Sequence, residues 1–387
     1  MAAASFTRTV SMSPAMMEYL DNAESMGPDS FAAAGAERRA ALGIGKANNK
    51  RGLNENYARE LMELHTLGVN GGYTQQDVTE VAKVFTGWTV EAPRDGGGFI
   101  YQDRKHEPGD KHVLGKTIRN NGQQEGVEVL HMLATSPATA KFISRKLAIR
   151  FVSDDPPQPL IDAMAKTFLS SHGDIREVMR TMLRSPEFRS REAYRAKVKT
   201  PLEYVVSAVR ATQTDAAHPQ SLISALNQMG MPLYGMQTPN GYSDMADGWV
   251  NSAALLTRMN FGVALAANKL PGLDCDLPAI TGATGAATAA DPAQDEARLE
   301  QLLLNGTVSD KTHQTVLSEM QKLPQQQAAA QNFVEKTAAD PLDATLNVKK
   351  KERPQARQVN LNVSLVGASE ANIAAGLLLG SPDFQRK

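Results

Sequence analysis

Two amphipathic helices joined by a glycine-rich turn are predicted between residues 52 and 88, and this stretch constrains the fold most strongly. Asn54 is a good N-cap for the first helix, and Gly68 is placed to end it. Thr74 and Asp77, three residues apart, form the carboxylate version of a capping box for the second helix. Connections this short and well specified indicate a helical hairpin.

Helical periodicity continues through most of the remaining chain, whereas signals for strands are few. Three further helices are predicted to begin where a capping hydroxyl precedes proline, at Ser13, Ser136 and Thr200. The segment after residue 88 is rich in glycine and charge, so we expect a long excursion there. We therefore predict an all-α fold, with a multi-helix, bundle-like core, long irregular loops and a linker-rich C-terminal third.

Composition divides the chain into three parts. Residues 1–276 are predicted to form the helical core. From Leu277 the sequence shifts to Ala, Thr, Gly and Pro, so residues 277–358 are predicted to be a linker-like, low-complexity insertion that includes two helices. Residues 359–387 are predicted to form a C-terminal segment whose helix docks back on the core.

Several classes of function are disfavoured by composition and motifs. The 387-residue chain has a formal net charge of -1, so no global field attracts it to nucleic acid, and no nucleic-acid partner is predicted. Its single cysteine, Cys275, excludes an intrachain disulfide and a Cys-based zinc site. The chain lacks a phosphate loop, a dinucleotide fingerprint and a Gly-x-Ser-x-Gly elbow, so it carries no nucleotide motif. A soluble protein is predicted, because no apolar run approaches a membrane span of about 18 residues and no signal peptide is visible.

A carboxylate in an unexpected position marks the candidate site. On a helical wheel of the first hairpin helix, Glu60 falls inside the apolar arc, between Leu64 and Leu67. Asn56 and Glu63 flank Glu60, and the three polar side chains form one strip. A carboxylate buried at such a position must be protonated, paired with a cation or bound to a metal.

Two interpretations of this strip are open. In the first, Glu60 is a general acid/base or a cation ligand, with Glu63 as a second carboxylate and a divalent cation as a fitting cofactor. In the second, Glu60 is a structural carboxylate paired with a core arginine. The arginines considered are Arg145, Arg150 and Arg258. Under both, Glu60→Ala is expected to cost more stability than Glu80→Ala, because only Glu60 lies on the apolar face.

Further polar residues are candidates for binding. They are Asp21, Asn22, His65, His106, Lys111, Asn240 and Tyr242. His106 and Lys111 lie on the long excursion and could meet Glu60 across a cleft, although a solvated charged loop explains them as well. His65, at the edge of the apolar face, fits a boundary residue equally well. Asn240 and Tyr242 belong to a Pro-Asn-Gly-Tyr turn signal that is also a candidate binding loop.

Motifs along most of the chain resemble the bacterial family called domain of unknown function 1800. They include LNENYARELMELHTLGVNGGYTQQDVTEVAKVFTGW, PAMMEYLDNAES, HEPGDKHVLGKTI, ATAKFISRKLAIRFVSDDPP, TPLEYVVSAVRA, MGMPLYGMQTPNGYSD and LLLGSPDFQ. The resemblance implies a helical, mostly exported or periplasmic bacterial protein, often encoded beside a sulfatase-like family called domain of unknown function 1501. This chain begins almost at PAMMEYLDN, without the helical segment and export signal that usually precede it, which leaves localisation open.

Two hypotheses of function follow. The first is an envelope-associated binding or assembly protein that acts with a partner protein, for example of the domain of unknown function 1501 family, or with a surface polymer. The second is a hydrolase-like or cation-dependent enzyme whose carboxylate site lies on the helix between Asn54 and His65. Its predicted site joins Asn56, Glu60 and Glu63 with Asp21, Asn22, His106 and Lys111.

Overall fold

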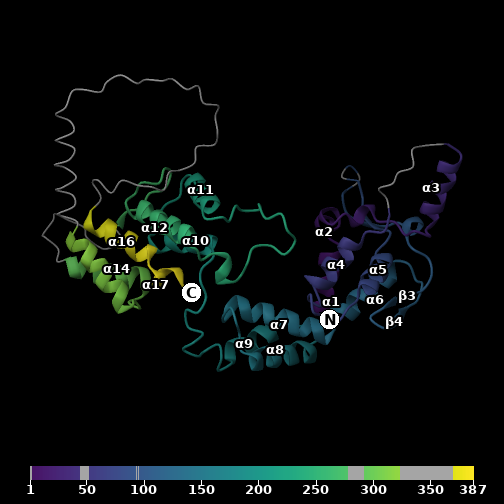
Figure 1. Cartoon of the computed structure of the whole chain (residues 1–387), viewed down its shortest axis with the longest axis horizontal. Helices are drawn as coiled ribbons and strands as arrows, with labels where there is room; N and C mark the ends of the chain where they lie inside the picture. Colours follow the sequence, from purple (N-terminus) through teal and green to yellow (C-terminus); the bar gives the residue numbers. More distant parts are fainter. Residues whose placement is uncertain (1, 44–51, 93, 95, 278–291, 323–368) are drawn as a thin grey trace, which may run out of the picture. The chain divides into compact units, whose positions relative to one another are not determined.

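The computed structural model describes residues 2–43, 52–92, 94, 96–277, 292–322 and 369–387. The chain divides into two compact units, Met1–Tyr194 and Arg195–Lys387 (Figure 1). The boundary between the units lies within residues 1–276, which the sequence analysis predicts to form one helical core. Residues 278–291 and 323–358, which the predicted insertion contains, lie outside the described residues.

The predicted helical hairpin forms in unit 1 as α4 (Glu55–Glu63) and α5 (Gln75–Val84). The N-cap Asn54 accepts a hydrogen bond from the Asn56 amide at 2.9 Å. Thr74 and Asp77 make the reciprocal bonds of a capping box. Gly68 has a φ of 82°, a left-handed conformation that favours glycine. However, α4 ends at Glu63, so Gly68 lies in the turn that follows the helix and does not end it as predicted. The local signals in the sequence therefore predict the hairpin and the starts of its two helices correctly, but they place the end of the first helix too late.

The other helices of unit 1 precede the hairpin or follow it along the chain. They are α1 (Ala2–Ser11), α2 (Pro14–Tyr19), η1 (Asn22–Glu24), α3 (Phe31–Ala41), α6 (Gln123–Ala134), α7 (Pro137–Phe151), α8 (Gln158–Ser170) and α9 (Ile175–Arg184). One apolar core lies among α2, α4, α5 and α6, and a second lies among α7, α8 and α9. The second core follows the first along the chain.

The long excursion of unit 1 contains two small antiparallel ribbons and a short 3-10 helix. Strand β1 (Trp88–Val90) pairs with β2 (Phe99–Tyr101), and β3 (Lys111–Val113) pairs with β4 (Lys116–Ile118). The 3-10 helix η3 (Asp103–Lys105) lies between the ribbons. Trp88 packs so closely on α6 that a Cβ at Gly126 would lie 2.3 Å from the indole ring. Helices still dominate the fold, as predicted.

Unit 2 is also helical. Its helices are α10 (Pro201–Ala211), α11 (Gln220–Gln228), η4 (Ala246–Gly248), α12 (Ser252–Ala266), α14 (Pro292–Leu304), a helix over 310–322, α16 (Glu370–Gly380) and α17 (Pro382–Gln385). The terminal helix α16 lies along α12, where a Cβ on Gly376 would lie 2.7 Å from the Cα of Val263. Tyr204 donates a hydrogen bond to the Arg258 carbonyl at 2.7 Å in this core. Within the described parts of both units, every helix is too short or too polar to cross a bilayer.

Candidate functional site

The polar strip on α4 lies at the surface of unit 1. Glu60 and Glu63 are half-buried, whereas Asn56 and His65 are exposed. Desolvation raises the pKa of Glu60, and the nearby charge of Glu63 raises it further. The Tyr73 hydroxyl donates to Oε2 of Glu63 at 3.3 Å. The structure thus places two neighbouring carboxylates on this strip, one of which holds its proton more tightly than usual.

His65 is fixed at the end of the same helix. Its Nδ1 lies 2.9 Å from the carbonyl oxygen of Glu60. Because a carbonyl only accepts hydrogen bonds, Nδ1 carries the proton in this contact, and a neutral ring then has its lone pair on Nε2. The positive charge of Arg59 also acts on Glu60 and opposes the rise of its pKa. Arg258, one of the arginines considered for pairing, lies in unit 2 and donates to the Lys199 carbonyl at 2.9 Å.

His106 and Lys111 come together inside unit 1, on a third residue that the sequence analysis did not single out. Nε2 of His106 lies 3.0 Å from Oε1 of Glu125, and Nζ of Lys111 lies 2.7 Å from Oε2 of the same carboxylate. The three side chains are nearly inaccessible, with exposed fractions of 4%, 1% and 0%. The excursion therefore carries a buried ion-pair network.

Backbone groups complete the surroundings of this network. Oε1 of Glu125 accepts hydrogen bonds from the amides of Asn121 at 2.8 Å and Gly122 at 3.0 Å. The other ring nitrogen of His106 lies 2.9 Å from the Thr86 carbonyl oxygen. Burial would raise the pKa of Glu125, but hydrogen bonds from His106, Lys111 and Asn121 outweigh it and lower that pKa. The carboxylate is held as an anion that fastens the excursion to the start of α6.

The sequence contained a partial signal for Glu125. Gly122 precedes α6, and Glu125 is the third residue of that helix, where a carboxylate often caps the preceding amides. That signal predicts that Glu125 accepts hydrogen bonds from the amides just before α6, and the structure shows these bonds. Its pairing with Lys111 depends on how the β3–β4 ribbon folds back, and no spacing in the sequence reports that contact.

Asn22 and Asp21, the two binding candidates nearest the N-terminus, have different surroundings. Asn22 is buried, and its amide donates to the carbonyls of Phe85 at 3.3 Å and Trp88 at 3.0 Å. These bonds hold the turn between α5 and β1. Asp21 is exposed and has a φ of 57°. Asn22 thus has a clear structural use, whereas Asp21 faces solvent.

Asn240 and Tyr242 lie in unit 2, on an irregular loop over residues 231–251. The Tyr242 hydroxyl donates to the Pro232 carbonyl at 2.6 Å, and the Trp249 indole donates to the Ser243 carbonyl at 2.8 Å. Asn240 is exposed, whereas Tyr242 is half-buried. The two candidates therefore belong to a different unit from the α4 strip, and internal hydrogen bonds give their loop a defined shape.

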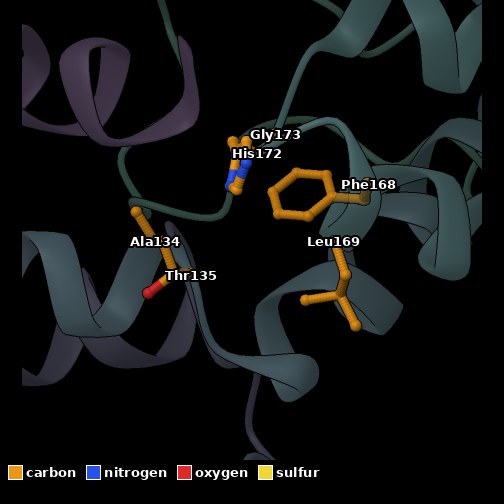
Figure 2. A pocket seen from close by; sticks show the side chains of 6 residues that line it. All are labelled: Ala134, Thr135, Phe168, Leu169, His172 and Gly173. Carbon is orange, nitrogen blue, oxygen red and sulfur yellow. The ribbon is translucent and has the colours of Figure 1, made fainter. Parts of the chain in front are cut away.

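An open hollow of about 190 Å³ lies between the end of α6 and the end of α8. Figure 2 shows the residues that line it, Ala134, Thr135, Phe168, Leu169, His172 and Gly173. His172 is the one titratable side chain among these six. A hollow with a single titratable group and no carboxylate in its lining does not supply an acid/base pair, so it is not the centre that the second hypothesis requires.

Comparison with known proteins gives one result. The family model described as "Protein of unknown function (DUF1800)" matches residues 3–386, which is essentially the whole chain. No curated protein and no solved structure matched the sequence. The match extends through both units and includes the α4–α5 hairpin. The chain therefore belongs to the family described as protein of unknown function DUF1800.

Proposed function

We propose that this chain is an envelope-associated binding protein, and that the irregular loop of unit 2 over residues 231–251 contacts a partner protein. We call this segment the recognition loop. The observation that carries the proposal is a set of large apolar side chains exposed on this loop. They are Leu233, Tyr234, Met236, Met245 and Val250. The loop projects from the helices of unit 2 (Figure 1).

The shape of the recognition loop supports binding to a protein. Aromatic residues and Met are enriched where proteins meet, and exposed apolar groups that cluster on a loop favour an interaction site. The bonds from Tyr242 and Trp249, together with a bond from Nζ of Lys197 to the Asp244 carbonyl at 2.6 Å, fix the loop backbone in advance. A loop that is ordered before binding loses less conformational entropy on association.

The partner we favour is a protein of the domain of unknown function 1501 family from the same genome. Calorimetric titration of that purified protein with the wild-type chain should show saturable binding. We expect Tyr234→Ser to weaken it at least about tenfold, the effect of losing one central aromatic contact. The matched control is Val69→Ser, which replaces an exposed apolar side chain in unit 1. Absence of binding by the wild-type chain, or equal affinity of the Tyr234 variant, would contradict the proposal.

A second candidate function rests on the raised pKa of Glu60 beside Glu63. A carboxyl group of raised pKa beside a second carboxyl group is an arrangement used in general acid/base hydrolysis. Hydrolysis of ester, phosphate and glycoside substrates should then be measurable, lost in Glu60→Gln and retained in Glu80→Gln. Hydrolysis that is absent from the wild-type chain, or unchanged in Glu60→Gln, would exclude an α4 active site for those substrates.

A further inference from the structure

Three potential metal ligands converge between two helices of unit 2. Glu296 and Glu300 lie one turn apart on α14, and His313 lies on the helix over 310–322. One ligand atom from each residue lies within 4.8 Å of the others. Within the described part of the chain, no other group of three or more His, Cys, Asp or Glu side chains meets this condition, and the α4 strip does not either.

The contacts in this cluster are centred on one ring nitrogen. Nδ1 of His313 lies 2.9 Å from Oε1 of Glu300, 3.2 Å from Oε1 of Glu296 and 3.1 Å from Oε2 of Glu296. One N–H cannot donate well to three oxygens at once. Oε2 of Glu296 is buried and, like Oε2 of Glu125, has no hydrogen-bond donor in suitable geometry among the described residues. Oε2 of Glu125, however, lies 2.7 Å from the Lys111 ammonium, whereas Oε2 of Glu296 lies 3.1 Å from the imidazole that Glu300 also contacts. The cluster thus contains more acceptor oxygens than protons to satisfy them.

The charged groups of the cluster are also unbalanced, because two carboxyl groups face one imidazole. The Glu296 side chain is 0% exposed, and it shares a single imidazole with a second carboxylate. Burial, followed by the effects of Glu300, raises the pKa of Glu296 to about 7. Hydrogen bonding to Glu300 is the largest of the causes that raise the pKa of His313. The cluster thus places two carboxyl groups, one of them fully buried, against a single imidazole.

We propose that Glu296, Glu300 and His313 bind a divalent first-row transition metal ion such as Zn²⁺. One imidazole nitrogen with carboxylate oxygens is a donor set that suits such ions, whereas Mg²⁺ and Ca²⁺ prefer oxygen ligands alone. Donors about 2.1 Å from one zinc ion lie about 3 to 3.4 Å apart. The imidazole nitrogen lies 2.9 to 3.2 Å from the carboxylate oxygens, close to that separation. The ion would supply the positive charge that a buried carboxylate requires.

The site would join two helices that follow each other in the sequence. Glu296 lies on the buried side, whereas the His313 side chain is 43% exposed, so the ion can enter from solvent beside the imidazole. Such an ion would clamp α14 to the helix over 310–322. This proposal is independent of the recognition loop and of the α4 strip, because it uses none of their residues.

The test is calorimetric titration of ZnCl₂ into the full chain, without a histidine tag and after removal of metals with a chelator. We expect one zinc ion per chain and much weaker binding of MgCl₂. His313→Gln removes the partly exposed nitrogen ligand and should weaken zinc binding by more than about 100-fold, because loss of an outer-shell partner alone costs about 10- to 100-fold. Circular dichroism would verify that the variant is folded.

His131→Gln is the matched control, because His131 is an exposed histidine on α6 of unit 1. It should leave zinc binding unchanged. If the wild-type chain binds no zinc, the cluster is a proton-sharing ion-pair network and the proposal is wrong. If His313→Gln binds zinc as the wild type does, the ion is bound elsewhere and the proposal is also wrong. Glu300→Gln provides a second variant, with the same expected loss.

Discussion

The two units each bury a glutamate beside a histidine, and the two carboxylates have opposite electrostatic surroundings. Glu125 of unit 1 faces His106, the ammonium of Lys111 and two backbone amides, and its pKa is lowered. Glu296 of unit 2 shares one histidine with another carboxylate, and its pKa is raised to about 7. Both side chains are 0% exposed, so burial alone does not distinguish them.

This comparison separates a structural carboxylate from a ligand-binding one. A buried carboxylate with enough hydrogen-bond donors and a positive charge beside it is fully compensated. A ligand could bind there only by displacing one of these partners. A buried carboxylate with too few hydrogen-bond donors is poorly compensated, and a bound cation stabilises it. The number and charge of its partners, rather than the depth of burial, therefore indicate where unit 2 accepts an ion.

The largest expected effect is on the Glu125 network. Lys111→Met should lower the free energy of unfolding of unit 1 by about 3–5 kcal/mol, because it leaves Glu125 buried without its ammonium partner. Lys116→Met, on the neighbouring strand at an exposed position, is the control and should change stability by less than about 0.5 kcal/mol. Denaturant unfolding followed by hydrogen exchange of peptides from unit 1 measures both. Equal effects of the two variants would contradict a structural role for the network.

The next effect is that of zinc on unit 2. Free zinc at 100 times its dissociation constant should raise the free energy of unfolding of this unit by about 2.7 kcal/mol, because the ion binds only the folded state. Hydrogen exchange should slow in peptides from α14 and the helix over 310–322. Peptides from α4 and α6 should not change. Protection that appears equally in both units would show that zinc acts elsewhere.

The pH dependence should have opposite signs in the two networks. The pKa of Glu296 rises from 4.5 to about 7 on folding, so the stability that protonation contributes is full below pH 4.5 and is lost as the pH rises through about 7. The raised pKa of His313 adds a loss in the same direction. The lowered pKa of Glu125 contributes stability above about pH 4.5 that is lost on acidification.

Metal-free unit 2 should therefore become less stable from pH 5 to pH 8, and Glu296→Gln should flatten that slope. Unit 1 should lose stability only at acid pH. Hydrogen exchange at a series of pH values, corrected for the intrinsic exchange rate, measures each unit separately. A slope that persists in Glu296→Gln would mean that other groups cause it.

The smallest effect concerns two surface glutamates. We now expect Glu80→Ala to cost about 1 kcal/mol and Glu60→Ala close to none. Glu80 is 13% exposed, pairs with Lys83 at 2.8 Å and accepts from the His112 amide at 3.0 Å. Glu60 is half-buried and its carboxylate form is disfavoured. This order reverses the one expected from the helical wheel. Melting temperatures of the two variants would show which of the two orders is correct.

Features that depend on neighbouring residues could be predicted from the sequence. The hairpin, its caps at Asn54 and Thr74 and the helices that begin at Ser-Pro and Thr-Pro pairs all arise from interactions over three or four residues. The helical wheel placed Glu60 near the apolar face correctly, but a wheel cannot show that α5 and the β3 strand give Glu80 better partners. That information belongs to tertiary structure.

The two buried networks could not be found in this way. Lys111 and Glu125 are brought together by a ribbon that folds back on α6, and His313 meets Glu296 only because two helices pack together. The spacing of Glu296 and Glu300 by one helical turn was visible, but such pairs are common on solvated helices. The division into two units depends on which helices pack together, and composition does not report that.

The most direct test of the comparison is the free energy of unfolding of Glu125→Gln and Glu296→Gln, measured at pH 7 in metal-free buffer by hydrogen exchange in the unit concerned. Glutamine has nearly the same shape as glutamate, and its side chain is uncharged at every pH. Our account predicts that Glu125→Gln destabilises unit 1 by about 3 kcal/mol, whereas Glu296→Gln leaves unit 2 as stable as before or more stable. Equal destabilisation by both substitutions would show that Glu296 is as fully satisfied as Glu125 and would contradict the account.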